Sequence, residues 1–84
     1  MSYADEVRGY CARHIIEPAR ARGESEVAIC AGDVHKAMGY QRRFPLVCSA
    51  LGTKLFEQTY RVRRKGVEGP LQGSTTVFRF AILP

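Results

Sequence analysis

The apolar positions at the start of the chain repeat with the period of an α-helix. Four of them recur at spacings of three and four, which places them on one helical face: Ala4, Val7, Cys11 and Ile15. Ser2 and Asp5 have the spacing of a capping box, in which the hydroxyl accepts a hydrogen bond from a free helix N–H. We therefore expect a helix after Ser2, an end or a kink before Pro18, and a final turn that stops at Gly23.

A short strand and a second helix are predicted next. Residues 26–30 alternate in the manner of a strand that buries Val27 and Ile29. Gly32 or Asp33 is then expected to cap a short helix. The inner face of this helix is predicted to hold Val34, Ala37 and Met38.

The third predicted helix has the longest apolar stripe in the chain. The stripe follows helical spacing from residue 44 to residue 55 and comprises Phe44, Val47, Cys48, Leu51 and Leu55. Pro45 suits the first helical position, where its missing N–H costs nothing. Gly52 interrupts the stripe and indicates a bend or a restart.

The end of the chain predicts a β-hairpin. In the first strand of this hairpin, Tyr60 and Val62 are expected to face the protein core, and Arg61 and Arg63 to point outward. Residues 66–74 are rich in turn formers and predict a loop. In the second strand, one face is predicted to hold Thr76, Phe78, Phe80 and Ile82.

Length and composition indicate one small globular domain over residues 1–84. The order of the predicted helices and strands puts this domain in the α+β class. The chain is 45% hydrophobic and 25% charged, which is ordinary for a folded domain. No apolar run approaches the roughly 20 residues of a membrane span. The first residues lack a basic and then apolar leader, so a cytoplasmic protein is expected.

No catalytic or metal chemistry emerges from the residue pattern. Cys11, Cys30 and Cys48 lack C-x-x-C spacing and are expected to be buried apolar residues. His14 and His35 are expected to be surface or half-buried helix residues rather than ligands. We expect no enzyme, no metal, no cofactor and no small-molecule substrate.

The distribution of charge is the strongest functional signal. Residues 1–40 carry five Lys or Arg and six Asp or Glu, a net charge of −1. Residues 41–84 carry eight and two, a net charge of +6, with basic clusters at 42–43 and 61–65. One-sided positive charge on a small domain is typical of a protein that binds a polyanion.

The element order resembles the winged helix-turn-helix family, which implies three helices, a short strand and a C-terminal hairpin wing. Residues 4–8 (ADEVR), 32–39 (GDVHKAMG) and 47–52 (VCSALG) are also similar to a small, poorly characterised prokaryotic module. In winged helices the third helix enters the major groove of DNA, and the wing contacts the neighbouring backbone. The resemblance implies a non-enzymatic binder of double-stranded DNA with a role in transcription regulation.

Carried onto this chain, the resemblance implies contacts from the third helix and the stem of the wing. The candidate DNA-binding residues are Arg42, Arg43, Ser49, Thr53, Lys54, Arg61, Arg63, Arg64 and Lys65. Arg42 or Arg43 could contact guanine, whereas Lys54, Arg64 and Lys65 would neutralise phosphates. Glu68 and Gln72 make the wing tip a poor phosphate contact.

The alternative is a protein-interaction module that dimerises or docks on a larger protein, with incidental basic charge. The apolar residues left for such an interface are Tyr3, Tyr10, Leu46 and Leu71, and the first helix is the expected self-contact. RNA binding is a weaker option, because no aromatic stacking surface is apparent. A basic hairpin edge also discourages edge-to-edge pairing of strands, so the run at 61–65 favours no alternative by itself.

Overall fold

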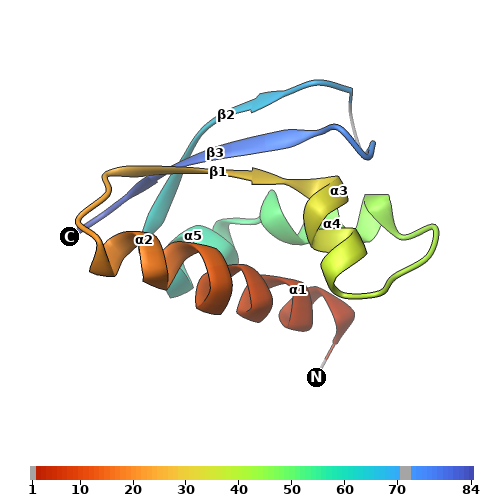
Figure 1. The fold of residues 1–84 in the computed structure, drawn as a ribbon, viewed down its shortest axis with the longest axis horizontal. Helices are drawn as coiled ribbons and strands as arrows, with labels where there is room; N and C mark the ends of the chain where they lie inside the picture. The colour runs from red at the N-terminus through yellow and green to blue at the C-terminus, as the bar shows by residue number, and fades with distance from the viewer. Residues whose placement is uncertain (1, 71–72) are drawn as a thin grey trace.

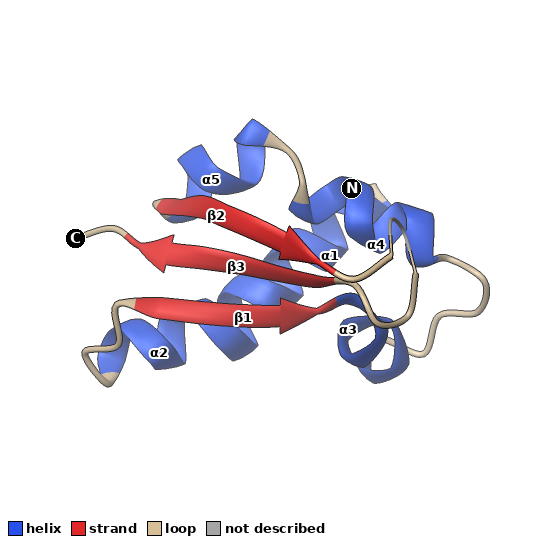
Figure 2. Cartoon of the chain, turned by 90° about the horizontal axis from the view of Figure 1, so that it is seen from above, coloured by secondary structure: helices blue, strands red, loops and turns tan. Residues whose placement is uncertain are grey.

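The computed structural model describes residues 2–70 and 73–84; Leu71 and Gln72, on the predicted loop, lie outside this description. The described residues form a small α+β fold with four helices and a three-stranded antiparallel sheet (Figure 1). The sheet and the helices form two layers, with the strands above the helices in Figure 1, and the view from above shows β3 between β1 and β2 (Figure 2). Within the described chain, no helix combines the length and apolarity needed to cross a membrane.

The first helix is continuous through three segments: α1 (Tyr3–Cys11), the π-helical turn η1 (Ala12–Ile16) and α2 (Glu17–Ala21). The predicted capping box is confirmed, because the Ser2 hydroxyl accepts from the Asp5 N–H at 3.1 Å and the Asp5 carboxylate accepts from the Ser2 N–H.

Pro18 does not end this helix. The N–H of Glu17 donates to the carbonyl of Ala12, five residues earlier, so the turn before the proline is wider than an α-helical turn. This wider turn accommodates a residue that has no N–H and whose ring crowds the preceding turn. The helix stops where the sequence predicted, since Gly23 has a φ of 77°.

The predicted strand is confirmed as β1 (Glu26–Cys30), with Ile29 fully buried. It runs directly into α3 (Ala31–Ala37), for which Cys30 is the N-cap in extended conformation. The predicted cap at Gly32 or Asp33 is therefore wrong by two to three residues. Strand and helix share one junction, which leaves no separate capping turn.

The inner face of α3 differs in part from the predicted one. Val34 is buried as expected and Met38 packs partly against the core, but Ala37 is exposed. Because the helix begins earlier than predicted, its buried face includes Ala31 and His35 instead.

The third predicted helix divides into α4 (Phe44–Leu51) and α5 (Lys54–Tyr60). The break lies at Gly52, where a bend or restart was expected, and the chain restarts with Thr53 as the N-cap of α5. Leu55 is consequently 52% exposed, so its predicted place on the apolar stripe is wrong.

The hairpin is confirmed as β2 (Val62–Glu68) and β3 (Val77–Ile82), in a sheet with strand order β1-β3-β2. Tyr60 belongs to α5 rather than to the strand, because the helix ends only at Arg61, which takes a φ of 57°. The strand then continues through three residues of the predicted loop, up to Glu68.

The core lies between the sheet and the helices. The inward face of β3 holds Phe78 and Phe80, and Thr76 lies just before the strand; all three are nearly inaccessible to solvent, as the alternating pattern predicted. Phe56 of α5 packs edge-on against Phe80 with ring centroids 5.2 Å apart. Burial also raises the pKa of the Cys11 thiol to about 12, so this thiol is uncharged at neutral pH.

Candidate nucleic-acid interface

The turn between α3 and α4 carries Arg42 and Arg43. Arg42 is exposed and has a φ of 55°, in the left-handed region. The N–H of Arg43 donates to Nε2 of His35 at 3.0 Å, and its guanidinium lies 4.6 Å from the centre of the Tyr3 ring. The His35 ring also stacks on Phe44, with centroids 4.0 Å apart. Side chains from α1, α3 and α4 therefore position this turn.

His35 is more deeply buried than the sequence indicated, with 7% of its surface exposed. The expectation of a surface or half-buried residue is wrong, because Tyr40 and Phe44 pack against its ring. The acceptor role of Nε2 requires this nitrogen to be unprotonated. His35 thus links α3 to the turn that carries the two arginines.

We expect His35→Ala to destabilise the protein by about 1–3 kcal/mol, because it removes the acceptor of a partly buried N–H together with the stacked ring. Urea unfolding followed by circular dichroism measures the change. Lys36→Ala is the matched control, since Lys36 is the exposed neighbour on the same helix. Equal losses in the two variants would contradict this role of His35.

Ser49 and Arg64 line the same groove, between α4 and β2. This groove has a volume of about 240 Å³, and Gly52, Val67 and Phe78 also contribute to its walls. A Cβ placed on Gly52 would lie 3.3 Å from a guanidinium nitrogen of Arg64, so the arginine side chain passes over this glycine. The structure thus brings together one predicted residue from the helix and one from the hairpin.

Thr53 and Lys54 stand at the start of α5 and differ in accessibility. The Thr53 hydroxyl accepts from the Phe56 N–H at 3.3 Å and donates to the Ala50 carbonyl at 2.9 Å. The Arg8 guanidinium also approaches it at 3.5 Å. The Thr53 hydroxyl therefore caps the start of α5, whereas the side chain of Lys54 is exposed.

The basic run at 61–65 is divided between the two faces of the sheet. Arg63 pairs with Ala81 of β3 and lies on the face away from the helices, whereas Arg64 pairs with Phe80 and lies on the helical side. Lys65 is an extra residue at a β-bulge.

The two ends of this run have partners elsewhere in the fold. The Lys65 ammonium forms an ion pair with Glu26 of β1 at 3.1 Å. Since β3 separates β1 from β2, this pair crosses the outer face of the sheet. The Arg61 guanidinium donates to the carbonyl oxygen of Pro84. The basic run therefore does not form one contact surface.

The two basic clusters also lie toward opposite ends of the molecule. The loop before α4 projects at the end that holds the start of α1, and β2 begins near the other end, beside α5 (Figure 1). Groove residues Ser49 and Arg64 belong to the elements that connect these ends.

Most of the bases that the structure describes in the second half of the chain form no ion pair. The ion pairs seen among the described residues join Arg8 to Asp5, Arg20 to Glu17, Arg22 to Glu24, Lys65 to Glu26 and Arg79 to Glu68. Within the described residues, six bases of the second half form no ion pair: Arg42, Arg43, Lys54, Arg61, Arg63 and Arg64. Their charge remains available to an external anion.

Glu68, near the hairpin tip, is neutralised by its neighbour. Its carboxylate accepts from the Arg79 guanidinium at 2.7 Å and 3.3 Å. This contact lowers the pKa of Glu68 and raises the pKa of Arg79. The acid at the tip thus repels an approaching phosphate less than the sequence alone implied.

Two arginines have structural roles that the sequence analysis missed. Arg8 is 8% exposed and donates to Asp5 at 2.7 Å and to the Ala50 carbonyl at 3.5 Å. Arg20 donates to the Tyr60 carbonyl at 2.9 Å. A signal existed for Arg8, which falls three residues before Cys11, on the apolar face of its helix.

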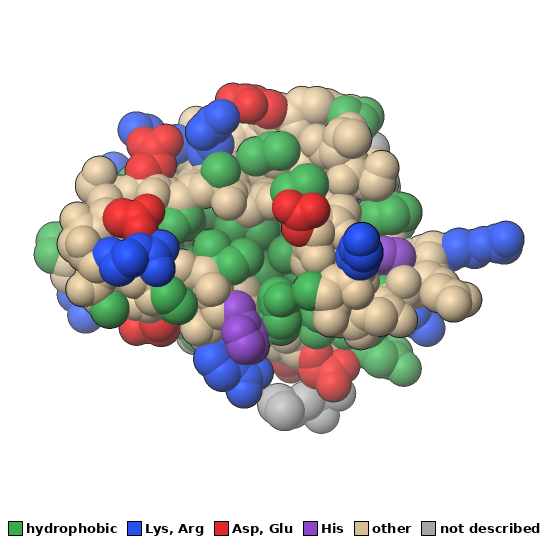
Figure 3. All heavy atoms as spheres, in the orientation of Figure 1, with side chains coloured by type: hydrophobic (Ala, Val, Ile, Leu, Met, Phe, Trp, Pro, Cys, Tyr) green, Lys and Arg blue, Asp and Glu red, His purple; other side chains and the backbone are tan. Residues whose placement is uncertain are grey.

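The side of the molecule between β1 and α1 is mainly apolar rather than basic. Figure 3 shows apolar side chains gathered between β1 and α1, with Lys and Arg side chains mostly around the margin. A small hollow of about 150 Å³ lies there, lined by Tyr10, Ile15 and Ile29 among others. In the described part of the chain, no group of three or more His, Cys, Asp or Glu side chains could hold a metal ion.

No protein-family model matches this chain, and comparison with curated proteins and with solved structures gives no match either.

Proposed function

We propose that this chain is a non-enzymatic DNA-binding module of the winged-helix type, which contacts double-stranded DNA with α4, the turn before it and the stem of the β2–β3 hairpin. The observation that carries the proposal is the set of second-half bases without ion pairs. The order of helices and strands, with a hairpin beside α4, supports the winged-helix type.

The structure narrows the contact set. Arg42 and Arg43 have exposed side chains on a positioned turn, and Arg64 lies beside Ser49 in the groove. Lys54 adds an exposed charge at the start of α5. The hydroxyl of Thr53 and the charge of Lys65 already have partners within the fold, so we assign these two residues minor roles.

We expect steeply salt-dependent DNA binding. About four phosphate contacts would weaken binding by about 150-fold between 50 and 200 mM salt. Fluorescence anisotropy with a labelled duplex at several salt concentrations measures this slope. Absence of binding at the lowest salt concentration would reject the proposal.

Charge-matched variants locate the interface. Arg42→Gln combined with Arg64→Gln should lower both the affinity and the salt slope, because two phosphate contacts are lost. Arg22→Gln combined with Lys36→Gln also removes two positive charges, one at the C-cap of α2 and one on α3, both outside the proposed contact set, and should leave the slope unchanged. Equal effects of the two variants would indicate attraction by net charge without a defined interface.

A further inference from the structure

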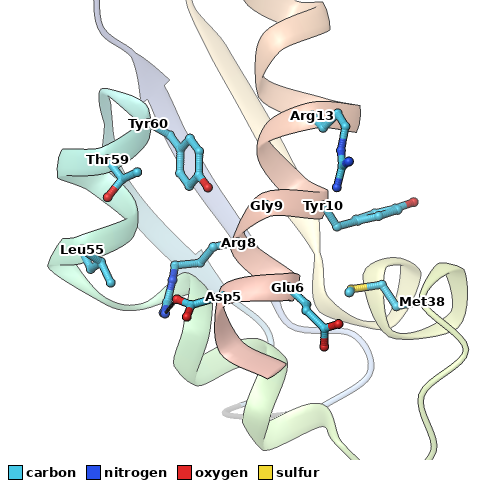
Figure 4. Close-up of a pocket in the computed structure, with 10 residues that line it drawn as sticks. All are labelled: Asp5, Glu6, Arg8, Gly9, Tyr10, Arg13, Met38, Leu55, Thr59 and Tyr60. Carbon is cyan, nitrogen blue, oxygen red and sulfur yellow. Dashed lines mark hydrogen bonds and ion pairs between the residues drawn. The ribbon is translucent and has the colours of Figure 1, made fainter. Parts of the chain in front are cut away.

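A second surface of interest lies on α1, on the side turned away from the sheet. A hollow of about 640 Å³ extends over α1 and reaches α5 on one side and the end of α3 on the other (Figure 4). Gly9 lies at its middle, and a Cβ placed there would meet no atom within 4 Å. The missing side chain leaves the helix backbone accessible to a partner.

The walls of this α1 hollow are partly apolar. Leu55 of α5 is 52% exposed, and Tyr10, Met38 and Tyr60 are half-buried around the hollow. Exposed apolar side chains around a concave surface are typical of a protein interface.

Two side chains of opposite charge lie along the same edge of the hollow, one before and one after Gly9 in the sequence. Glu6 and Arg13 are both exposed, and neither forms an ion pair within the described residues. Burial, together with the charge of the Glu6 carboxylate, raises the pKa of Tyr40. Figure 4 shows Glu6, Tyr10 and Arg13 on the same side of the helix.

We propose that the α1 hollow is a homodimer interface, in which a second copy of the chain packs its α1 antiparallel across Gly9. The two copies are related by a two-fold axis that passes through the helix crossing, lies in the plane of the interface and is perpendicular to α1. This rotation places Glu6 of each copy opposite Arg13 of the other. The same rotation places Leu55 of one copy opposite the end of α5 in the other copy, which carries Thr59 and Tyr60.

This self-complementarity is the reason to choose a second copy over an unrelated partner. In a two-fold interface the same surface serves both subunits, so each charge needs its opposite at the mirrored position. Glu6 and Arg13 lie about 5 Å along the helix on either side of their midpoint, next to Gly9. The glycine lets the two helix backbones approach closely where they cross.

The proposed dimer also fixes the relation between the two candidate DNA interfaces. The Arg43 guanidinium packs on Tyr3, so its turn lies at the N-terminal end of α1. Antiparallel pairing therefore places the two turns at opposite ends of the dimer. The dimer proposal does not depend on DNA binding.

Sedimentation velocity of the full chain, over a wide concentration range without DNA, tests the dimer. We expect the wild-type protein to form dimers, and Glu6→Arg and Arg13→Glu each to weaken dimerisation by about tenfold or more through like-charge contacts. The double variant, with the two charges exchanged, should restore dimerisation to near the wild-type level. Restoration would not occur if the single variants acted on folding.

Gly9→Leu gives an independent test. Because nothing lies near Gly9 in the monomer, the leucine should preserve the circular dichroism spectrum and thermal unfolding while it blocks the helix crossing. A wild-type protein that stays monomeric at every concentration would overturn the proposal. So would a dimer that none of these substitutions weakens.

Discussion

Replacing Gly32 with alanine is expected to destabilise the fold by about 1–3 kcal/mol, although alanine is the better helix former. Gly32 lies in the first turn of α3, where a Cβ would collide with the carbonyl oxygen of Ser74 and lie 3.1 Å from its carbon. Both neighbours are backbone atoms, so no side-chain rotation can relieve the contact. Either α3 or the segment that leads into β3 must move.

This contact lies where the hairpin joins the rest of the fold. The Ala31 N–H donates to the Thr76 carbonyl at 2.8 Å, and Sγ of Cys30 approaches the Ser74 carbonyl at 3.6 Å. Displacement of the segment at Ser74 would weaken both contacts. The substitution therefore disturbs the position of the hairpin relative to α3 as well as local packing.

Gly66→Ala is the matched control, because a Cβ on this half-buried glycine of β2 meets no atom within 4 Å. Urea unfolding should show little change or a small gain for Gly66→Ala and a clear loss for Gly32→Ala. Similar unfolding midpoints for the two variants would show that the close approach at Gly32 does not constrain the fold.

Features set by neighbouring residues were predicted well from the sequence. The alternation from Thr76 to Phe80 placed the buried face of β3 correctly, because a strand turns successive side chains to opposite faces. The Ser2 capping box and the stop at Gly23 follow from backbone chemistry within one turn.

The break in the third helix shows how a regular apolar spacing can mislead. Leu55 continues the spacing of the α4 stripe, yet it belongs to a new helix that starts after the break at Gly52. Gly52 followed by Thr53 was the better signal, because a glycine suits a helix end and a threonine suits the next N-cap. The hydroxyl of Thr53, a candidate DNA contact, has hydrogen-bond partners within the fold.

The dispersal of the basic run could be foreseen only in part. Strand alternation alone separates the neighbours Arg63 and Arg64. The ion pair between Lys65 and Glu26 joins residues 39 positions apart and depends on the strand order β1-β3-β2. No local pattern in the sequence encodes that order, so the pairing could not be predicted.

Phe80→Ala is expected to cost about 3–5 kcal/mol, the largest loss among these predictions. A domain of this length has a total stability of about 4–13 kcal/mol, so the loss is a large share of the total. Phe80 is fully buried on the central strand β3 and meets Phe56 of α5 edge-to-face at 5.2 Å. Its removal leaves a cavity between the sheet and the helical layer, where neither layer can collapse without breaking strand pairing.

Val67→Ala provides the control for loss of apolar volume. Val67 lies on the same face of the sheet as Phe80 but is 40% exposed, so its truncation should cost less than about 1 kcal/mol. Urea unfolding at 25 °C, followed by circular dichroism, compares both variants with the wild-type protein. A loss below about 1.5 kcal/mol for Phe80→Ala would mean that the two layers are held together chiefly by contacts of other side chains.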